Sequence, residues 1–161
     1  ALIYSQAQTW IEGTVAGKVT IVAADVSVGT GSFNPDIWLK GDINYYTATN
    51  GSVGLTAVAE RSVLFPLTVP STMSIRGVFV AQGGYIGRNR YDCSTLTSFV
   101  HTGTVVSNKR TGTQWTTPGA CGGYSGFLNR TDNYDRLLAF SPPPFTPSAS
   151  VDYKLNLWRE K

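Results

Sequence analysis

A short pattern recurs along the chain and constrains its fold more than any other feature: an apolar residue, a polar residue, Gly, any residue and a second apolar residue. It reads IEGTV at 11–15, LKGDI at 39–43 and IRGVF at 75–79, with a weaker copy, VHTGTV, at 100–105. The glycines are Gly13, Gly41, Gly77 and Gly103, spaced by 28, 36 and 26 residues. We expect these glycines at corners of the chain, because such bends often need a positive φ, which penalises a Cβ.

Longer segments repeat as well, since KVTIVAADVSV at 18–28 resembles VGLTAVAERSVLF at 53–65. Short strands that return every roughly 20 to 30 residues are typical of a coil whose turns stack through parallel hydrogen bonds. The sequence therefore predicts an all-β, single-domain parallel β-helix, also called a β-solenoid. An antiparallel β-sandwich also has short alternating strands and stays open as the alternative. The side chains expected to point inward are Ile11, Val15, Val19, Ile21, Ile43, Leu55, Val58, Val63, Ile75 and Val80.

The length of 161 residues fits one domain, 1–161. We expect a repeat-bearing core over about 1–110, with stapled loops and a capping tail over about 88–161. The tail contains Pro142, Pro143, Pro144 and Pro147, which favour extended structure, and ends in an alternating segment at 150–161. It is predicted to strap one flank or to cap the last turn, because a bare end would expose an unpaired strand edge.

Two cysteines, Cys93 and Cys121, lie in loop-like sequence and form no CxxC pair. They predict one disulfide, worth about 3 kcal/mol on the chain-entropy model, with two unpaired buried thiols as the alternative. A disulfide implies an oxidising, extracytoplasmic compartment. No stretch approaches eighteen consecutive apolar residues, so no membrane span is expected.

The charge balance is mildly basic, with 13 Lys and Arg against 10 Asp and Glu. This permits an anionic partner without demanding one. Candidate contacts to an anionic ligand are Arg88, Arg90, Lys109, Arg110 and Arg130. Candidate aromatic contacts, which could stack on sugars or unpaired bases, are Tyr45, Tyr46, Tyr85, Tyr91, Trp115 and Tyr124. The competing interpretation is a solvated basic surface and aromatic side chains that pack over loops.

Signals for catalysis and metal binding are weak. His101 is the only histidine and lies in an apolar strand context, and GxSxG does not occur. Carboxylates that could align up one face are Glu12, Asp42 and Glu60, but cations occupy similar positions and favour ion pairs. The cluster Asp132, Asn133 and Asp135 is more typical of a turn than of a calcium site. We therefore predict no enzyme activity, no metal and no cofactor.

Several segments together resemble a known group: QTWIEGTVAGKVTIVAADVSV, VGLTAVAERSVLF, IRGVFVAQGGYIG and the closing NYDRLLAFSPPPFTP…YKLNLWREK. They are similar to bacterial envelope proteins associated with type IV pilus assembly, the PilX-type minor pilins. The resemblance implies an extracytoplasmic β-rich domain that follows an N-terminal hydrophobic pilin helix, and this sequence contains no such helix. A related competence-type minor pilin implies DNA capture, but no DNA-contacting residue matches.

The expected function is that of a non-enzymatic extracytoplasmic structural or adhesion domain of a minor-pilin-like or cell-surface protein. Its partners would be other pilin or envelope subunits, with DNA or a glycan as a possible ligand. The first alternative is a DNA-binding module of a competence-type pilus protein, which would use the basic residues beside loop aromatics. The second alternative is a polysaccharide-binding or polysaccharide-cleaving β-helix.

Overall fold

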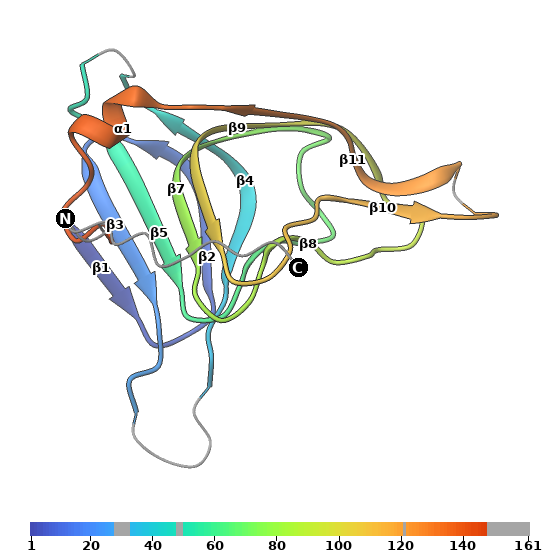
Figure 1. The fold of residues 1–161 in the computed structure, drawn as a ribbon, viewed down its shortest axis with the longest axis horizontal. Coiled ribbons are helices and arrows are strands. Elements are labelled where there is room, and N and C mark those ends of the chain that lie inside the picture. The colour runs from blue at the N-terminus through green and yellow to red at the C-terminus, as the bar shows by residue number, and fades with distance from the viewer. Residues whose placement is uncertain (28–32, 48–49, 121, 148–161) are drawn as a thin grey trace, which may run out of the picture.

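The computed structural model describes residues 1–27, 33–47, 50–120 and 122–147. These residues form eleven strands of one sheet and one short helix. In chain order the elements are β1 (Leu2–Ser5), β2 (Thr9–Val15), β3 (Lys18–Ala23), β4 (Ile37–Tyr45), β5 (Gly54–Ala59), β6 (Val63–Phe65), β7 (Thr72–Ala81), β8 (Ile86–Arg88), β9 (Thr95–Ser107), β10 (Gln114–Thr117), β11 (Gly123–Asn133) and α1 (Arg136–Phe140). The chain is thus all-β, which confirms the predicted class (Figure 1).

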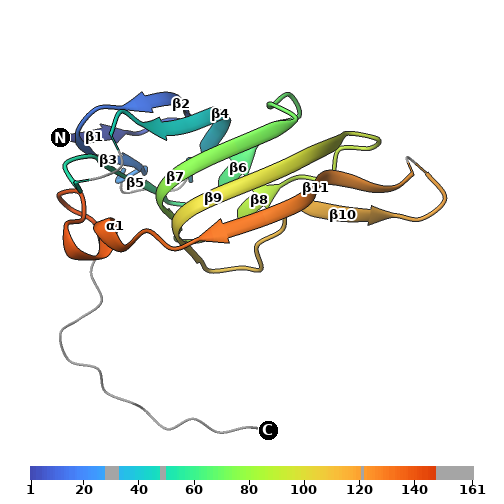
Figure 2. The ribbon, with the colours of Figure 1, turned by 90° about the horizontal axis from the view of Figure 1, so that it is seen from above.

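The strands pair in two ladders, and most of the pairs are parallel. Odd-numbered strands pair in the order β1, β3, β5, β7, β9 and β11. Even-numbered strands pair in the order β2, β4, β6 and β8, and an isolated parallel bridge joins Gly87 of β8 to Gly112. Each of the segments β1–β2, β3–β4, β5–β6 and β7–β8 therefore adds one strand to each ladder. Among the described residues, the antiparallel pair is β10 with β11, which projects from one side of the sheet (Figures 1 and 2).

Of the four repeat glycines, Gly77 and Gly103 stack directly, whereas Gly13 and Gly41 do not pair with each other. Gly77 and Gly103 are direct partners in the β7–β9 ladder, with φ of 144° and 140°. Gly13, with φ of 110°, lies at a register shift between β2 and β4 and pairs with Ile43. Gly41 lies beside Glu12, because a Cβ on Gly41 would come within 2.7 Å of the Glu12 carboxylate. The positive φ expected at these glycines is thus present at Gly13, Gly77 and Gly103 and absent at Gly41.

The core lies inside the bend of the sheet and contains three mutually packed rings. The ring centroids of Phe65, Phe99 and Phe127 are 5.0–5.7 Å apart. Of the side chains predicted to point inward, Ile43, Leu55, Val63 and Ile75 are buried in this core, and Ile11, Val15, Val19 and Ile21 are partly buried against it.

Val58 and Val80 are the exceptions among the predicted inward side chains. Both are buried, but the core contains their strand neighbours Ala57 and Phe79 instead. Because side chains alternate along a strand, Val58 and Val80 lie on the opposite face of the odd-numbered ladder. That ladder is therefore buried on both faces at β5, where every residue is buried.

The described part of the Pro-rich tail lies across the outer face of β3 and β5. The hydroxyl of Thr56 is 2.7 Å from that of Thr146, and Thr20 donates to the carbonyl of Pro144. Leu138 of α1 and Pro143 pack onto Gly54, where a Cβ would come within 3.0–3.1 Å of both side chains. These contacts tie the tail to one flank of the sheet. The alternating segment at 150–161, expected to form a last strand, lies outside the described residues.

Candidate functional site

A cleft of about 600 Å³ gathers four of the residues predicted to contact a ligand. Two are cations, Lys109 and Arg110, and two are aromatic residues, Tyr85 and Trp115. The remaining lining residues are Thr111, Gly112, Gln114 and Thr116. We refer to this set of eight residues as the basic aromatic cleft.

Backbone pairing at β8 positions the cationic wall of the cleft. The N–H of Arg88 donates to the carbonyl of Gly112 at 2.8 Å, and the N–H of Gly112 donates to that of Ile86 at 3.2 Å. The N–H of Lys109 donates to the carbonyl of Gly84 at 2.9 Å. Gly87 permits this approach, since a Cβ there would lie 2.1 Å from the Gly112 carbonyl oxygen. The segment that contains Lys109 and Arg110 is therefore held by main-chain contacts, while both side chains stay exposed.

The two rings of the cleft are fixed at their polar edges. The indole Nε1 of Trp115 donates to the carbonyl of Arg88 at 2.8 Å, and the side chain stays 39% exposed. The hydroxyl of Tyr85 donates to the side-chain oxygen of Asn89. Burial and the nearby Asp36 carboxylate raise the pKa of Tyr85, so its hydroxyl is neutral and remains a donor at pH 7. Held in this way, the rings lose little freedom when a ligand stacks on them.

Arg88, predicted to contact an anionic ligand, is instead fully buried, at 0% exposure. Its guanidinium donates to the carbonyl of Leu67 at 3.0 Å and to the hydroxyl of Ser94 at 2.6 Å. It also lies 4.7 Å from the centroid of the Tyr91 ring, and burial lowers the pKa of Arg88. The surface role predicted for this residue is therefore wrong, because the guanidinium supports the protein interior.

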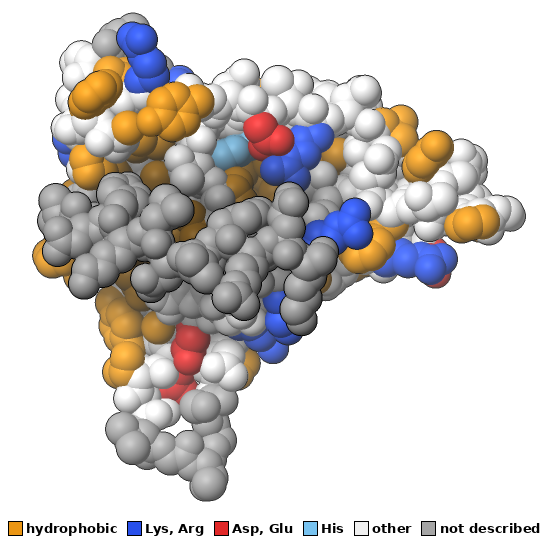
Figure 3. All heavy atoms as spheres, viewed as in Figure 1, with side chains coloured by type: hydrophobic (Ala, Val, Ile, Leu, Met, Phe, Trp, Pro, Cys, Tyr) orange, Lys and Arg blue, Asp and Glu red, His pale blue; other side chains and the backbone are white. Residues whose placement is uncertain are grey.

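The other two predicted cations lie outside the cleft and are paired with carboxylates. Arg90 lies 3.3 Å from Asp92. Arg130 makes two hydrogen bonds to Asp132, at 2.8 and 3.0 Å, and its guanidinium lies over the ring of Phe99. On the face shown in Figure 3, Lys and Arg side chains are scattered rather than gathered in one stripe.

The remaining predicted aromatic contacts do not line the cleft. Tyr46 and Tyr124 are exposed, with Tyr124 opposite the cleft residue Thr116 in the β10–β11 pair, and Tyr91 packs against Arg88. Tyr45 ends β4, and its hydroxyl accepts the N–H of Leu55 at 3.0 Å. Burial raises the pKa of Tyr45. Tyr45 therefore contributes to packing and backbone hydrogen bonding.

His101 forms a buried contact that the sequence pattern did not reveal. The side chain is almost fully buried, with Nε2 3.3 Å from the Gly77 carbonyl and Nδ1 3.4 Å from Asp132. Burial lowers the pKa of His101, despite the opposing effects of the Gly77 carbonyl and the Asp132 carboxylate. The pKa of Asp132 is lowered chiefly by its hydrogen bonds with Arg130.

The carboxylates considered for catalysis or calcium binding engage other groups. Glu12 lies 4.0 Å from Lys40, Asp42 accepts the N–H of Ser74, and Glu60 accepts that of Asp25. Asp135 caps α1 by accepting the N–H of Leu137 at 3.0 Å. Within the described ranges, no three or more His, Cys, Asp or Glu side chains form a group suited to a metal ion.

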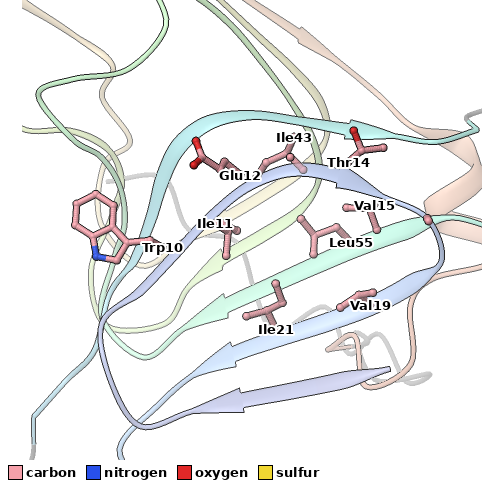
Figure 4. Close-up of a pocket in the computed structure, with 11 residues that line it drawn as sticks. Trp10, Ile11, Glu12, Thr14, Val15, Val19, Ile21, Ile43 and Leu55 are labelled. Atoms are coloured by element: carbon pink, nitrogen blue, oxygen red, sulfur yellow. The ribbon is translucent and has the colours of Figure 1, made fainter.

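A second cavity, of about 390 Å³, opens at the N-terminal edge of the sheet, which consists of β1 and β2. Ile11, Val15, Val19, Ile21 and Leu55 point toward one another in this cavity, whereas Trp10 points away (Figure 4). The outermost strand also exposes Leu2, Ile3 and Tyr4 to about half their surface. The sequence predicted that these side chains point inward, but it did not predict that the protein covers them only in part.

Cys93 is disulfide-bonded. Cys121, its predicted partner, lies outside the described residues. In the part of the chain that the structure describes, no helix has the length and apolar character needed to cross a membrane. No family model, curated protein or solved structure matches the chain, so the resemblance to minor pilins stays a prediction.

Proposed function

We propose that the chain is a parallel β-solenoid, a coil in which each turn adds one strand to each ladder. The register of the odd-numbered ladder supports this: Thr20 pairs with Leu2 on one side and with Thr56 on the other, and Thr56 pairs with Val78. The even-numbered ladder follows the same order, with Ile37 between Thr9 and Val63. A sandwich of antiparallel hairpins would instead pair strands that are consecutive in sequence.

On this scaffold we propose a non-enzymatic contact domain of an extracytoplasmic, minor-pilin-like or cell-surface protein, which binds an anionic polymer through the basic aromatic cleft. The carrying observation is that Lys109 and Arg110 meet Tyr85 and Trp115 in one cleft. Cations attract a negative ligand, and fixed rings add stacking surface at low entropic cost. The predicted disulfide is in keeping with the oxidising compartment of this proposal.

A titration with dextran sulfate, a polyanion without bases, tests the role of the cleft. The double variant Lys109→Gln/Arg110→Gln removes two positive charges from the cleft. The matched variant Lys40→Gln/Arg90→Gln removes two positive charges elsewhere, both already near carboxylates. We expect the cleft variant to bind about fivefold more weakly or worse, and the matched variant to bind within about twofold of wild type. Equal losses in both variants would show that only net charge matters and would refute the cleft.

The incompletely covered N-terminal edge favours a second role, assembly with pilin or envelope subunits. Exposed strand edges and apolar side chains are the features through which proteins add a neighbouring chain. A photo-crosslinker at Ile3 should capture envelope subunits in cells that carry the full-length protein, whereas one at Tyr46 should not. Equal capture from both positions would remove the N-terminal edge as the assembly surface.

A nucleic-acid-binding module is the main rival proposal, and it makes a different prediction about salt. A protein that contacts six to ten phosphates loses about 10³–10⁵ in affinity between 50 and 200 mM salt. Binding of a duplex at low salt with that dependence would favour the rival. A panel of polysaccharide substrates tests the cleaving alternative, because product formation would require a catalytic function.

A further inference from the structure

We propose that the ligand of the basic aromatic cleft is a short stretch of acidic polysaccharide, with one carboxylate on each sugar ring. This inference rests on the proposed function, because it names the polymer class that the cleft takes. It follows from three properties of the site: how many cations it offers, how its rings are held, and which other polar side chains line it.

The number of available cations favours a ligand that needs only two ionic contacts. Arg88 is buried, and Arg90 and Arg130 are paired with carboxylates. Lys109 and Arg110 are exposed, have no ion pair within the described residues and line the cleft together. Two adjacent cations match two successive uronate carboxylates. A nucleic acid is usually met by a longer basic stripe than these two residues provide.

The polar atoms of both rings in the cleft already have partners within the protein. The indole N–H of Trp115 is occupied by the carbonyl of Arg88, and the hydroxyl of Tyr85 by Asn89. A partner in the cleft therefore meets mainly carbon surface on both residues. A sugar ring has an apolar C–H face that fits such a surface while its hydroxyls point sideways.

The polar side chains that line the cleft can both donate and accept hydrogen bonds. Thr111 and Thr116 contribute hydroxyls, and Gln114 contributes an amide. Sugar hydroxyls also donate and accept, so they satisfy both functions of these side chains. Phosphate oxygens only accept. Among the described residues lining the cleft, none is Asp or Glu, so no fixed negative charge opposes a carboxylate.

The test uses three probes on the intact domain: tetragalacturonate, its methyl ester and a dT oligonucleotide. The ester keeps the sugar rings and removes their charge. We expect tetragalacturonate to bind most tightly, with a loss of about tenfold or more on esterification, because a charged hydrogen bond is worth more than a neutral one. Calorimetry measures all three affinities under one buffer condition.

Variants then locate the binding site. Trp115→Ala should weaken tetragalacturonate binding by about tenfold or more, whereas Trp115→Phe should retain most of it, because a ring face remains. Arg90→Gln, outside the cleft, should leave the affinity within about twofold of wild type. Circular dichroism of each variant establishes that the fold is intact. If Trp115→Ala does not fold, Lys109→Gln/Arg110→Gln, which should also weaken tetragalacturonate binding, carries the test instead.

The outcomes separate this inference from the proposed function. Equal affinity for the ester, or tighter binding of dT than of tetragalacturonate, would overturn the acidic-sugar assignment. If the dT binding still depended on Lys109 and Arg110, the anionic-polymer function would stand without it. If neither tetragalacturonate nor dextran sulfate depended on these two residues, both proposals would fail.

Discussion

Replacing Gly103 with Ala tests whether β7 and β9 stack as closely as the structure indicates. Gly103 and Gly77 are partners in the ladder, and Gly103 has a φ of 140°. A Cβ on Gly103 would lie 2.0 Å from the carbonyl oxygen of Gly77 and 2.8 Å from its carbonyl carbon. Both are main-chain atoms, so relief of the clash requires the two strands to separate.

The expected cost has two parts that a second variant separates. A strained backbone costs about 1–3 kcal/mol, and overpacking against a neighbouring strand costs about 1–3 kcal/mol more, for a total of about 2–6 kcal/mol. Gly13 also has a positive φ, 110°, but a Cβ there meets nothing within 4 Å. Gly13→Ala therefore carries the backbone cost alone, about 1–3 kcal/mol.

Urea unfolding, followed by circular dichroism, gives the free energy of unfolding of each variant. Gly17→Ala is the baseline, because Gly17 has no positive φ in the left-handed range and open space around its Cβ position. We expect stability to decrease in the order Gly17→Ala, Gly13→Ala, Gly103→Ala. If Gly103→Ala is no less stable than Gly13→Ala, the two strands do not approach each other at this corner, and the stacked-turn argument fails.

Three further predictions concern single groups. The pKa of His101 in the folded state lies below its unfolded value of 6.5. Its contribution to the free energy of unfolding is therefore complete above pH 6.5 and is lost as the pH falls toward the folded-state pKa. His101→Gln should flatten this part of a curve of unfolding free energy against pH, and an unchanged curve would contradict the burial of His101. Tyr45→Phe leaves the N–H of Leu55 without its acceptor and should cost about 1–3 kcal/mol in urea unfolding, whereas no change would mean that water replaces the hydroxyl. Intact mass after alkylation should show no label without reductant and two labels with it if Cys93 and Cys121 form the disulfide, and any label without reductant would contradict that pairing.

The repeat pattern predicted the pairing of the first copy with the second and of the third with the fourth, but not the register between the second and the third. Ile11 of IEGTV pairs with Leu39 of LKGDI, as the pattern requires. The third copy does not continue this column, because Ile75 pairs with Ile43. Ile37 and Trp38 of β4 pair instead with β6, whose sequence VLF contains no glycine. A search keyed on glycine could not find that strand.

The alternation of apolar and polar residues predicted which side chains are buried where one face of a strand meets solvent. It failed to do so where both faces of a strand are covered. In β4 the buried and exposed residues alternate along most of the strand. In β5 all six residues are buried, since the core covers one face and the tail contacts the other through Thr56. When a strand is buried on both faces, its sequence does not show which face meets the core. The prediction that Val58 points into the core is therefore wrong.

The composition of the loops identified the residue types of the cleft but not their grouping. Arg88 and Lys109 both occur in polar, loop-like sequence, yet one is buried and the other exposed. The difference depends on acceptors such as the Leu67 carbonyl, 21 residues from Arg88 in sequence. Tyr85 and Trp115 lie in one cleft because Gly87 pairs with Gly112, and that contact spans a loop whose path the sequence does not reveal.

The position of the cleft follows from the unequal lengths of the two ladders. The even-numbered ladder ends at the single bridge between Gly87 and Gly112, whereas the odd-numbered ladder continues through β9 to β11. The segment between β9 and β10 therefore has a backbone anchor but, within the described ranges, no regular strand stacked on it. Its side chains, including Lys109 and Arg110, are not needed to fill a further layer of core. Because the even-numbered ladder ends early, side chains of this segment line the cleft without taking part in the packing of the strands that hold the segment.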